Sequence, residues 1–580
     1  MRIKDVEKRT GLSRKSIRFY ESRGLLQVGR SENSYREYDD AMITQLKAIA
    51  VLRKAGASIS DIQLWQDDVI TTQELLHKRL SELKDSSDVT AAQTELCRSL
   101  LDRFDPDAVL GVCPDTAPDE KEVPPPFSPD APLCLGIDIG TTTISSVVLD
   151  LTTGSAASYT VKSDADLPAP HSWEKLQDVQ LIEDRVRRLT DSLLQRYPGI
   201  RAIGFTGQMH GILYVDSMGT PLSPLYTWQD ERAGHGSPSA RDILYEKTGY
   251  RLSNGYGLAT HFALALSNEL PAGAAKLCTV MDYLAYSLCG KQDMLMHSSN
   301  AASLGLYDVA NGCFDPAALN KANIDPQLLP PVTNQCVCLG TYRQRPVSIA
   351  IGDNQASFLG TAAEPDSTVL ANFGTGSQVS LLCGPEIPAP PGLDIEIRPF
   401  LENRNLICGC ALCGGRAYAL LEQFFRSFIS ESCGTDQEQY TALNRLALRG
   451  LTQSDPLQVQ TTFCGTRSDP AARGSIFHIS ESSFTPAALA AGVLTGMAQE
   501  LHGMYLQMPH PSICRLVASG NAIRKNPALR KALEQVFGMS VLIPAHQEEA
   551  AYGAALFGAA AARLDTLTQL QRRCIHYQSA

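Results

Sequence analysis

A proline-rich, acidic stretch limits how this polypeptide can fold. Residues 105–132 contain eight prolines and seven acidic residues, including three consecutive prolines at Pro124, Pro125 and Pro126. A segment of this composition cannot bury an apolar core, and it favours a semi-rigid linker. We therefore divide the 580-residue chain into a short N-terminal part, this linker, and a C-terminal part long enough for more than one domain.

The part before the linker is basic, although the chain as a whole is acidic. Residues 1–38 hold ten Lys or Arg and five Asp or Glu, whereas the formal net charge of the chain is −11. The spacing predicts a helix over residues 3–10, a break at Gly11, and a second helix over residues 14–21 capped by Ser13. A basic helix after such a turn favours a nucleic-acid surface.

Further helical and turn signals follow in this part. A turn at residues 31–34 and the short segment 35–38 predict a wing that contacts phosphates. Apolar spacing over residues 42–52 predicts a third amphipathic helix, and a short helical piece follows over 59–65. Residues 73–104 are also predicted to be helical, with a polar break at Asp85, Ser86, Ser87 and Asp88.

Three motifs in this part resemble the MerR family of transcriptional regulators: IRFYESRGLL at 17–26, NSYREYDD at 33–40 and LRKAGASISDI at 52–62. The resemblance implies a winged helix-turn-helix domain over residues 1–70 and a dimerisation helix over 71–104, so that a homodimer binds promoter DNA. The DNA contacts that it implies are Arg14, Lys15, Arg18, Tyr20, Tyr35 and Arg36. Two alternatives stay open: the basic domain contacts protein, and the helix packs on its own domain.

The segment directly after the linker, LCLGIDIGTTTISSVVLD at 133–150, predicts a strand, a tight polar turn and a second strand. Gly140 and the threonines of the turn let backbone N–H groups and hydroxyls approach a phosphate closely. Asp138 is placed where a carboxylate could hold a hydrated Mg²⁺. An ordinary structural turn explains the segment equally well, so the later motifs decide between the two interpretations.

Two motifs downstream carry groups suited to a polyol. GFTGQMHG at 204–211 and YTWQDER at 226–232 supply glycines, hydrogen-bonding side chains and a flat aromatic face. A lone histidine is more often structural, but within this cluster we interpret His210 as a sugar contact.

A third motif, IAIGDNQA at 349–356, places Asp353 at the end of a predicted strand. Phosphoryl transfer to a hydroxyl needs a base for the proton, and one positioned aspartate suffices because positioning and electrostatics supply most of the catalysis. The same residue could cap a helix that begins near Ala356, and the two roles are compatible.

Two more strand-turn motifs complete the set. LANFGTGS at 370–377 can cradle a phosphate, and LVASGNA at 516–522 ends a strand in a glycine turn before a helix predicted over 527–537. Alternating strand-like and helical stretches over the whole C-terminal part predict an α/β architecture.

The segment at 133–150 and these later motifs, in this order, resemble the FGGY family of carbohydrate kinases, within the actin and hexokinase-like superfamily. The resemblance implies two ribonuclease-H-like domains over residues 133–365 and 366–562 that close over a sugar and ATP with Mg²⁺, and a C-terminal tail over 563–580. The expected fold class is therefore multidomain, with an α-helical winged helix-turn-helix module and an α/β actin/hexokinase-like two-domain kinase.

The resemblance also implies roles for individual residues. Asp353 would be the catalytic base, and Asp138 would hold Mg²⁺ through water. The implied sugar contacts are Gln208, Met209, His210, Asp230, Arg232 and Asn354. The implied nucleotide contacts are Gly140, Thr141, Thr142, Gly374, Thr375, Gly376, Gly520 and Asn521, of which Asn521 departs from the family's usual glycine-rich adenosine turn.

Within the family, motifs such as TGQMHG at 206–211 and CGTRSDPAARGSI at 464–476 are most similar to sedoheptulokinases, and xylulose kinases come next. We expect a protein that phosphorylates a ketose and regulates transcription. The alternatives are a silent sensor of sugar or ATP, and a kinase whose N-terminal module serves only dimerisation. The intact Asp353 favours an active enzyme, because a pure sensor has no chemical need for it.

The location and the cysteines complete the expectations. The chain begins without a signal peptide and has no apolar run long enough to span a membrane, so we expect a cytoplasmic protein without a membrane partner. Sixteen scattered cysteines indicate reduced thiols. We interpret the group Cys408, Cys410 and Cys413 as buried strand residues and not as a metal site.

Overall fold

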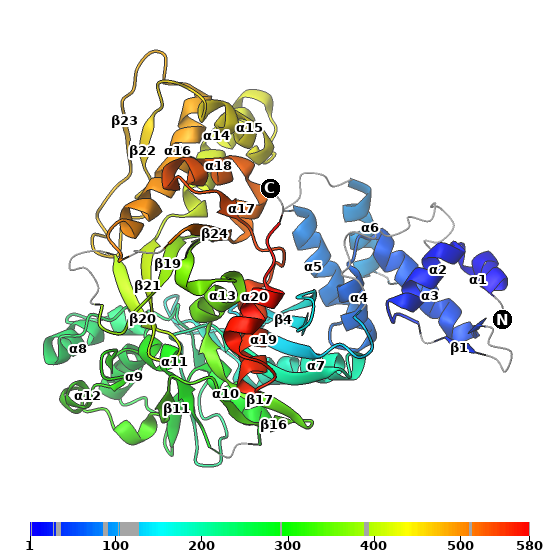
Figure 1. The fold of residues 1–580 in the computed structure, drawn as a ribbon, viewed down its shortest axis with the longest axis horizontal. Helices are drawn as coiled ribbons and strands as arrows, with labels where there is room; N and C mark the ends of the chain where they lie inside the picture. The colour runs from blue at the N-terminus through cyan, green and yellow to red at the C-terminus, as the bar shows by residue number, and fades with distance from the viewer. Residues whose placement is uncertain are drawn as a thin grey trace.

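Two six-stranded mixed sheets organise the C-terminal part of this computed structural model, and a small helical module lies beside the first of them (Figure 1). The structure describes the whole chain except residues 2, 27, 31–35, 85–90, 103, 105–126, 291–292, 388–393, 510–512 and 579–580. Most of the predicted linker therefore lies outside the described residues.

The N-terminal module has the helices that the sequence predicts. Its elements are α1 (Ile3–Thr10), α2 (Arg14–Ser22), β1 (Gly29–Arg30), β2 (Arg36–Glu37), α3 (Asp40–Lys54), α4 (Ile59–Gln66), α5 (Thr72–Lys84) and α6 (Ala91–Asp102). Ser13 caps α2, since its hydroxyl accepts a hydrogen bond from the Ser16 N–H at 3.2 Å. The wing strands β1 and β2 pair antiparallel, and the wing turn at 31–34 lies outside the described residues.

Helices α5 and α6 bury part of their apolar surface within this chain. They pack against each other, and Leu76, Leu83 and Leu100 are buried. The ring of Phe104, just after α6, meets the ring of Trp65 edge to face at 6.1 Å. Leu80 and Leu96 of the same two helices are half-buried, and the dimerisation helix over 71–104 stays a prediction.

The first sheet has the strand order β16-β17-β8-β3-β4-β5. Its strands are β3 (Leu133–Ile139), β4 (Thr143–Asp150), β5 (Ala156–Lys162), β8 (Ile200–Gly207), β16 (Cys338–Tyr342) and β17 (Arg345–Gly352). Strands β3 and β4 form the predicted hairpin, with Ile139 opposite Ile144, and β3, β8 and β17 run parallel. Helices around and between these strands are α7 (Val179–Arg196), α8 (Ala240–Thr248), α9 (Gly257–Leu266), α10 (Val280–Leu288), α11 (Ser298–Leu304), α12 (Pro316–Ala322) and α13 (Asp353–Thr361).

The second sheet has the order β20-β21-β19-β18-β24-β25. Its strands are β18 (Thr368–Phe373), β19 (Ser377–Cys383), β20 (Ile395–Pro399), β21 (Asn405–Ala411), β24 (Arg515–Ser519) and β25 (Val541–Leu542). The helices of this half are α14 (Gly415–Cys433), α15 (Tyr440–Gly450), α16 (Pro486–Tyr505), α17 (Asn521–Lys525) and α18 (Pro527–Phe537). The predicted helix over 527–537 is confirmed as α18, whereas α17 was not predicted.

Helix α19 (Glu549–Ala561) returns late in the chain to the first sheet, where it packs on β3, β8 and α13. Glycines allow this approach, since a Cβ on Gly136 would lie 1.9 Å from the Ala551 carbonyl oxygen and one on Gly553 would lie 1.8 Å from that of Ala356. Helix α20 (Leu567–Cys574), in the segment expected as a tail, packs against α19.

Substitution Gly553→Ala is expected to lower the free energy of unfolding by roughly 1–3 kcal/mol or more, because overpacking against rigid backbone cannot relax. Chemical denaturation of the full chain measures the change. The control is Gly503→Ala on α16, where an added Cβ meets nothing within 4 Å. It should stabilise slightly, because alanine has the higher helix propensity. Equal stability of the two variants would contradict the close packing of α13 and α19.

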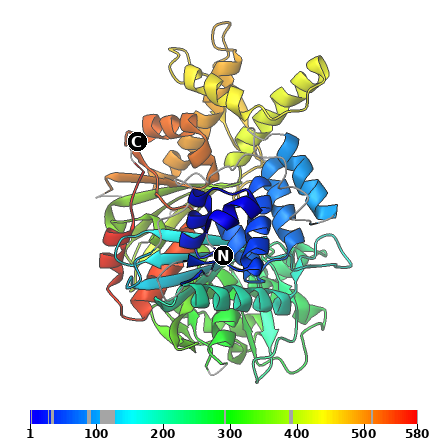
Figure 2. The ribbon, with the colours of Figure 1, turned by 90° about the vertical axis from the view of Figure 1, so that its right-hand side faces the viewer.

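The N-terminal module contacts the edge of the first sheet, where α4 packs against β5 (Figures 1 and 2). None of the helices that the structure describes is both long enough and apolar enough to cross a membrane.

Candidate active site

Two carboxylates meet at one edge of the first sheet. Asp138 lies near the end of β3, Asp353 follows the end of β17, and β8 runs between and parallel to both strands. The carboxyl ends of parallel strands share one edge of a sheet, which is where ligands bind in α/β folds. Asp353 is the first residue of α13, and Gly352 occupies the cap position, so the carboxylate is not used as the helix cap.

The surroundings of these carboxylates raise the pKa of both. Burial raises the pKa of Asp353 to about 6, against a backbone hydrogen bond from Asn354 and the charge of Arg398. Burial, Asp353 and Glu548 raise the pKa of Asp138 to about 8. A base with a pKa just below neutrality is ionised at pH 7 and still accepts a proton well, which suits general-base catalysis.

The oxygen donors here fit a hydrated Mg²⁺. Repulsion between neighbouring carboxylates raises their pKa, and a bound divalent cation lowers it again. Among the described residues no group of three or more His, Cys, Asp or Glu has the arrangement of a metal site. Mg²⁺ is usually held by one or two carboxylates, waters and substrate phosphates, so Asp138 alone, or Asp138 with Glu548, is compatible with it.

The turn between β3 and β4 is held by side chains from other segments. The Thr141 hydroxyl accepts a hydrogen bond from the Trp228 indole at 3.0 Å, and the Thr141 carbonyl oxygen accepts one from the Gln177 amide at 2.7 Å. A Cβ on Gly140 would lie 2.8 Å from the Thr143 carbonyl oxygen, so a side chain at this position would strain the turn. The turn that carries Gly140, Thr141 and Thr142 is therefore a preorganised loop.

A second loop, with Gly374, Thr375 and Gly376, joins β18 to β19 and meets two other glycine turns. The Gly415 N–H at the start of α14 donates to the Gly374 carbonyl oxygen at 2.9 Å. Gly520 has a φ of +95°, and a Cβ there would lie 2.4 Å from the Phe373 carbonyl oxygen. Asn521 is the first residue of α17, directly after this turn. Five of the eight residues expected to bind nucleotide, Gly374, Thr375, Gly376, Gly520 and Asn521, thus gather at one end of the second sheet, while Gly140, Thr141 and Thr142 lie in the turn of the first sheet.

Two of the expected sugar contacts, Met209 and Asn354, lie beside the catalytic strand end. A Cβ on Gly352 would lie 2.8 Å from the Met209 sulfur, which places Met209 next to the residue before Asp353. Asn354 follows Asp353, and its amide oxygen lies 3.6 Å from the Cys408 thiol.

A hydrogen bond at one ring nitrogen fixes the orientation of the His210 ring. Its Nδ1 lies 2.7 Å from the Ser303 carbonyl oxygen, and its ring stacks on that of Tyr256 at 4.4 Å. Burial lowers the pKa of His210 to about 4, so the ring is neutral at pH 7. Because a carbonyl oxygen only accepts, Nδ1 carries the proton, and Nε2 remains an acceptor for a hydroxyl group.

Two residues expected to contact the sugar serve other groups. Asp230 is 0% exposed, and its carboxylate accepts hydrogen bonds from Arg232 Nε at 2.7 Å and from the Lys175 N–H at 3.0 Å. Asp230 positions Arg232, whose guanidinium lies 4.5 Å from the Tyr226 ring centre, and its contact with the sugar stays a prediction. Gln208 is 4% exposed and bonds Gln177 at 3.0 Å, so it braces the phosphate turn instead of a sugar.

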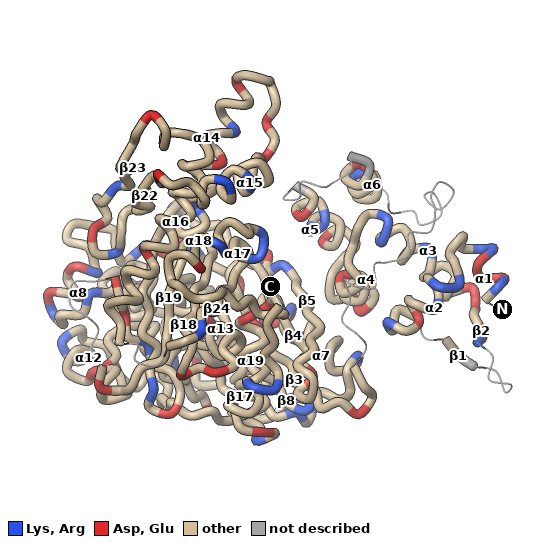
Figure 3. Tube along the Cα trace, turned by 45° about the horizontal axis from the view of Figure 1, so that its top comes forward, with Lys and Arg blue, Asp and Glu red and all other residues tan. Residues whose placement is uncertain are grey.

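Of the residues expected to contact DNA, the basic residues of α2 are exposed, whereas one tyrosine is buried. Arg14, Lys15 and Arg18 are exposed on α2, and Figure 3 shows basic positions along α1, α2 and α3 between acidic ones. Tyr20 is 1% exposed and belongs to the core, so its expected DNA contact was wrong. Arg36 pairs with Glu21 at 2.7 Å, and Tyr35 lies outside the described residues.

The cysteine group lies in or beside the second sheet. Cys408 and Cys410 are on β21 and Cys413 follows it, and all three are buried. This confirms the prediction of buried strand cysteines for Cys408 and Cys410.

Several residues near the site were not singled out by the sequence. Tyr256 stacks on His210, and Glu548 acts on the pKa of Asp138. Glu396 and Arg398 come from β20, and Arg398 acts on the pKa of Asp353. No local motif marks these residues, because they reach the site through the pairing of distant strands and helices.

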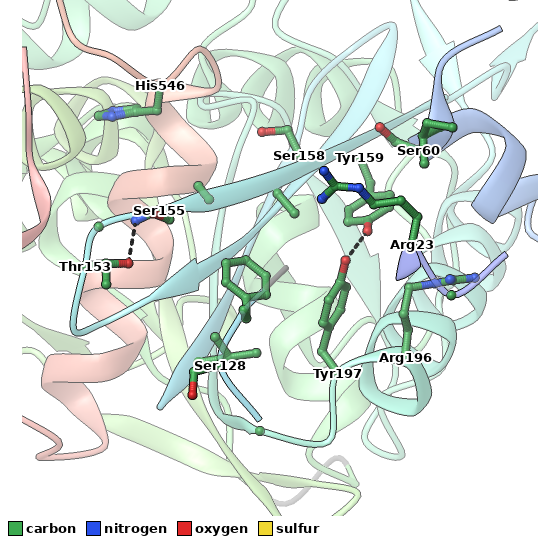
Figure 4. A pocket seen from close by; sticks show the side chains of 18 of the residues that line it. Arg23, Ser60, Ser128, Thr153, Ser155, Ser158, Tyr159, Arg196, Tyr197 and His546 are labelled. Carbon is green, nitrogen blue, oxygen red and sulfur yellow. Dashed lines mark hydrogen bonds between the residues drawn. The ribbon is translucent and has the colours of Figure 1, made fainter. Parts of the chain in front are cut away.

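The contact between the N-terminal module and the first sheet is largely polar. Asp67 accepts hydrogen bonds from Arg196 Nη2 at 2.7 Å and from the Ser192 hydroxyl at 2.6 Å, and the Tyr159 hydroxyl donates to Gln63 at 2.9 Å. A cavity of about 1010 Å³ lies at this junction, and its lining includes Arg23, Ser60, Tyr159, Arg196, Tyr197 and His546 (Figure 4). The cavity shares none of the expected catalytic, sugar or nucleotide residues.

Comparison with known proteins gives matches to both parts. Residues 133–360 match the model for the FGGY family of carbohydrate kinases, N-terminal domain, residues 413–562 match that for the C-terminal domain, and residues 1–68 match that for MerR HTH family regulatory proteins. Sedoheptulokinase of Mus musculus is 27% identical over 467 residues, which is 73% of this chain and 97% of that protein. Gluconokinase of Bacillus subtilis is 23% identical over 73% of this chain and 86% of its own length. The solved structure of gluconate kinase from Lactobacillus acidophilus superposes with a TM-score of 0.67 at 19% identity, over 77% of this chain and 92% of that one.

Proposed function

Because the chain belongs to the FGGY family of carbohydrate kinases and carries a MerR-type helix-turn-helix module before it, we propose that it is a bifunctional protein that phosphorylates a ketose and binds promoter DNA. It is an ATP-dependent carbohydrate kinase that uses Mg²⁺. The observation that carries the proposal is the buried Asp353, with its pKa raised to about 6, at the same sheet edge as Asp138.

The residues suggest how transfer proceeds. Asp353 takes the proton of the attacking hydroxyl, while Met209, Asn354 and the Nε2 atom of His210 hold the sugar. The turns at Gly140 and Gly374 hold the phosphates through backbone N–H groups. Asp138 would hold Mg²⁺ through water, and the bound ion would neutralise the charge of the phosphoryl group that ATP supplies. Since little covalent chemistry falls to the protein, positioning by these loops accounts for most of the expected rate.

We infer a ketose of the sedoheptulose type as the substrate. The support is the similarity to sedoheptulokinase along nearly its whole length, together with the motifs at 206–211 and 464–476. Xylulose is the next candidate. Incubation of the full chain with ATP and each sugar, followed by mass spectrometry of the sugar phosphate, tests the assignment. Formation of gluconate phosphate alone would contradict it.

We also propose that the N-terminal module binds promoter DNA as a homodimer. The support is the match over residues 1–68 and the exposed basic face of α2. Part of the apolar surface of α5 and α6 is buried within the chain, and we place the dimer contact on the rest of the segment 71–104. Sedimentation equilibrium with and without promoter DNA tests this part, and a monomer on DNA would contradict it.

We further propose that kinase-site occupancy and DNA binding are coupled through β5. Tyr159 on this strand bonds Gln63 of α4, and Lys78 of α5 donates to the Thr160 carbonyl oxygen at 3.0 Å. Three residues later, the Ser163 N–H donates to the Thr142 carbonyl oxygen at 2.9 Å, in the phosphate turn. Strand β5 and the residue after it thus contact both the N-terminal module and the phosphate turn, and we place the coupling on this connection.

Substitution Asp67→Asn is expected to weaken this coupling, because it removes the charge that pairs Asp67 with Arg196 across the junction. In the wild type, ATP with the ketose should change operator affinity by about 5-fold or more, the lower range of typical coupling. Asp67→Asn should reduce that change to below about 2-fold at an unaltered kcat. Fluorescence anisotropy of labelled operator measures it, and the adjacent exposed acid gives the control Asp68→Asn. An equal ligand-induced change in operator affinity in Asp67→Asn and Asp68→Asn would contradict a role of the Asp67–Arg196 pair in the coupling.

A further inference from the structure

Three charged side chains from separate places in the second half of the chain form one cluster. Glu396 and Arg398 are two residues apart on β20, so their side chains lie on the same face of the strand. The Glu396 carboxylate accepts hydrogen bonds from Arg398 Nε at 3.1 Å and Nη2 at 2.9 Å, and its other oxygen accepts one from Arg467. One carboxylate is thus shared by two guanidinium groups, and we refer to Glu396, Arg398 and Arg467 as the charged triad.

The sheet register places the charged triad beside the catalytic strand end. Glu396 lies directly opposite Cys408 in the antiparallel pair β20–β21, and directly opposite residues share a face. The Cys408 thiol is 3.6 Å from the amide oxygen of Asn354, the residue after Asp353. The triad therefore occupies the face of the second sheet that is turned towards the catalytic aspartate.

The triad also faces the expected sugar contacts of the first half. Helix α11 packs against β20, and the Ser303 carbonyl oxygen of α11 is the partner of His210 Nδ1. The charges of Arg398, Glu396 and Arg467 act on the pKa of both His210 and Tyr256. The Glu396 and Arg398 side chains keep 34% and 18% of their surface exposed, so they remain accessible to a ligand.

The chemistry of the triad distinguishes two kinds of sugar. Vicinal hydroxyls both donate and accept, and a carboxylate beside guanidinium groups offers both partners. A sugar acid brings its own carboxylate, which would be repelled by Glu396 and would compete with it for the same guanidinium donors. An arginine pair without Glu396 would instead suit a carboxylate.

We propose that the charged triad determines substrate class, with its polar atoms holding hydroxyl groups of an uncharged polyhydroxy ketone and Glu396 excluding sugar acids. This inference rests on the proposed ketose kinase function. It assigns specificity to β20, which lies outside the motifs found in the sequence, and to Arg467 within the motif at 464–476.

The test compares the ratio of kcat/KM for sedoheptulose to that for gluconate in the wild type and in Glu396→Gln. The substitution keeps the shape and removes the charge, so the ratio should fall about 100-fold, with about tenfold lost for the ketose and tenfold gained for gluconate. The control is Glu402→Gln, the same change at an exposed turn residue shortly after β20, and its ratio should equal that of the wild type. An unchanged ratio in Glu396→Gln would overturn the proposal.

Two further measurements distinguish a failure of the triad proposal from a failure of the proposed kinase function. Arg467→Gln, in an exposed loop, should raise KM for the ketose several-fold at nearly constant kcat and serves if Glu396→Gln does not fold. Calorimetric binding of the same two sugars gives the same ratio without turnover. If the wild type lacks turnover but the ratio of its affinities for the two sugars falls in Glu396→Gln, the result contradicts the kinase function and supports the triad. A wild type that prefers gluconate would overturn both proposals.

Discussion

Asp353→Asn is expected to lower kcat by about 10²- to 10⁴-fold, the usual contribution of a positioned general base. Asparagine keeps the size of the side chain and its place at the start of α13, but it cannot accept the proton of the attacking hydroxyl. Binding of the sugar should persist, because Met209, Asn354 and His210 remain in place. ADP release measures kcat, and calorimetry without ATP measures sugar affinity.

The matched control is Asp366→Asn, because the Asp366 side chain is 83% exposed and pairs with Arg404 away from the catalytic strand end. It should retain the wild-type rate. Equal turnover of Asp353→Asn and Asp366→Asn would remove the base assignment. Loss of sugar binding in Asp353→Asn would show that the residue holds the ground state instead.

Arg18→Ala is expected to weaken binding to operator DNA by roughly 30-fold to 10⁴-fold, from about 1–3 kcal/mol for each base contact in the two protomers of a dimer. Arg18 is exposed on α2, the helix that a helix-turn-helix module places in the major groove. The kinase rate should be unchanged. Gel retardation at a fixed salt concentration measures the affinity, since protein–DNA binding depends steeply on salt.

Arg188→Ala serves as the control for charge alone, because Arg188 is exposed on α7 of the kinase part. It removes the same charge from the same chain and should leave the retardation as it is. If both variants bind operator DNA as the wild type does, α2 is not the recognition helix, and the module serves another purpose.

The features that sequence predicts well here are local. Ser13 caps α2 and residues 133–150 form two paired strands with a tight turn, as expected, because capping and hairpin formation depend on residues close in the chain. The order of the five kinase motifs gave the fold class, and the strand register brings Asp138 and Asp353 to one sheet edge.

The features that sequence misses depend on distant segments. The tyrosine at position 20 is aromatic with a polar tip, so its burial follows only from how α2 packs on the module. Asp230 is satisfied by Arg232 and by the Lys175 backbone, 55 residues earlier. Glu396 and Arg467 are separated by 71 residues, so no spacing rule connects them.

The most direct test of the account is the rate of ADP release by the purified full chain with sedoheptulose, xylulose, ribulose, fructose, glycerol and gluconate, each measured against Asp353→Asn. We predict ADP release well above the Asp353→Asn background with the ketoses, and the highest kcat/KM with sedoheptulose. Release at the background level with every sugar would contradict it, and would leave a DNA-binding protein whose kinase part only senses its ligand.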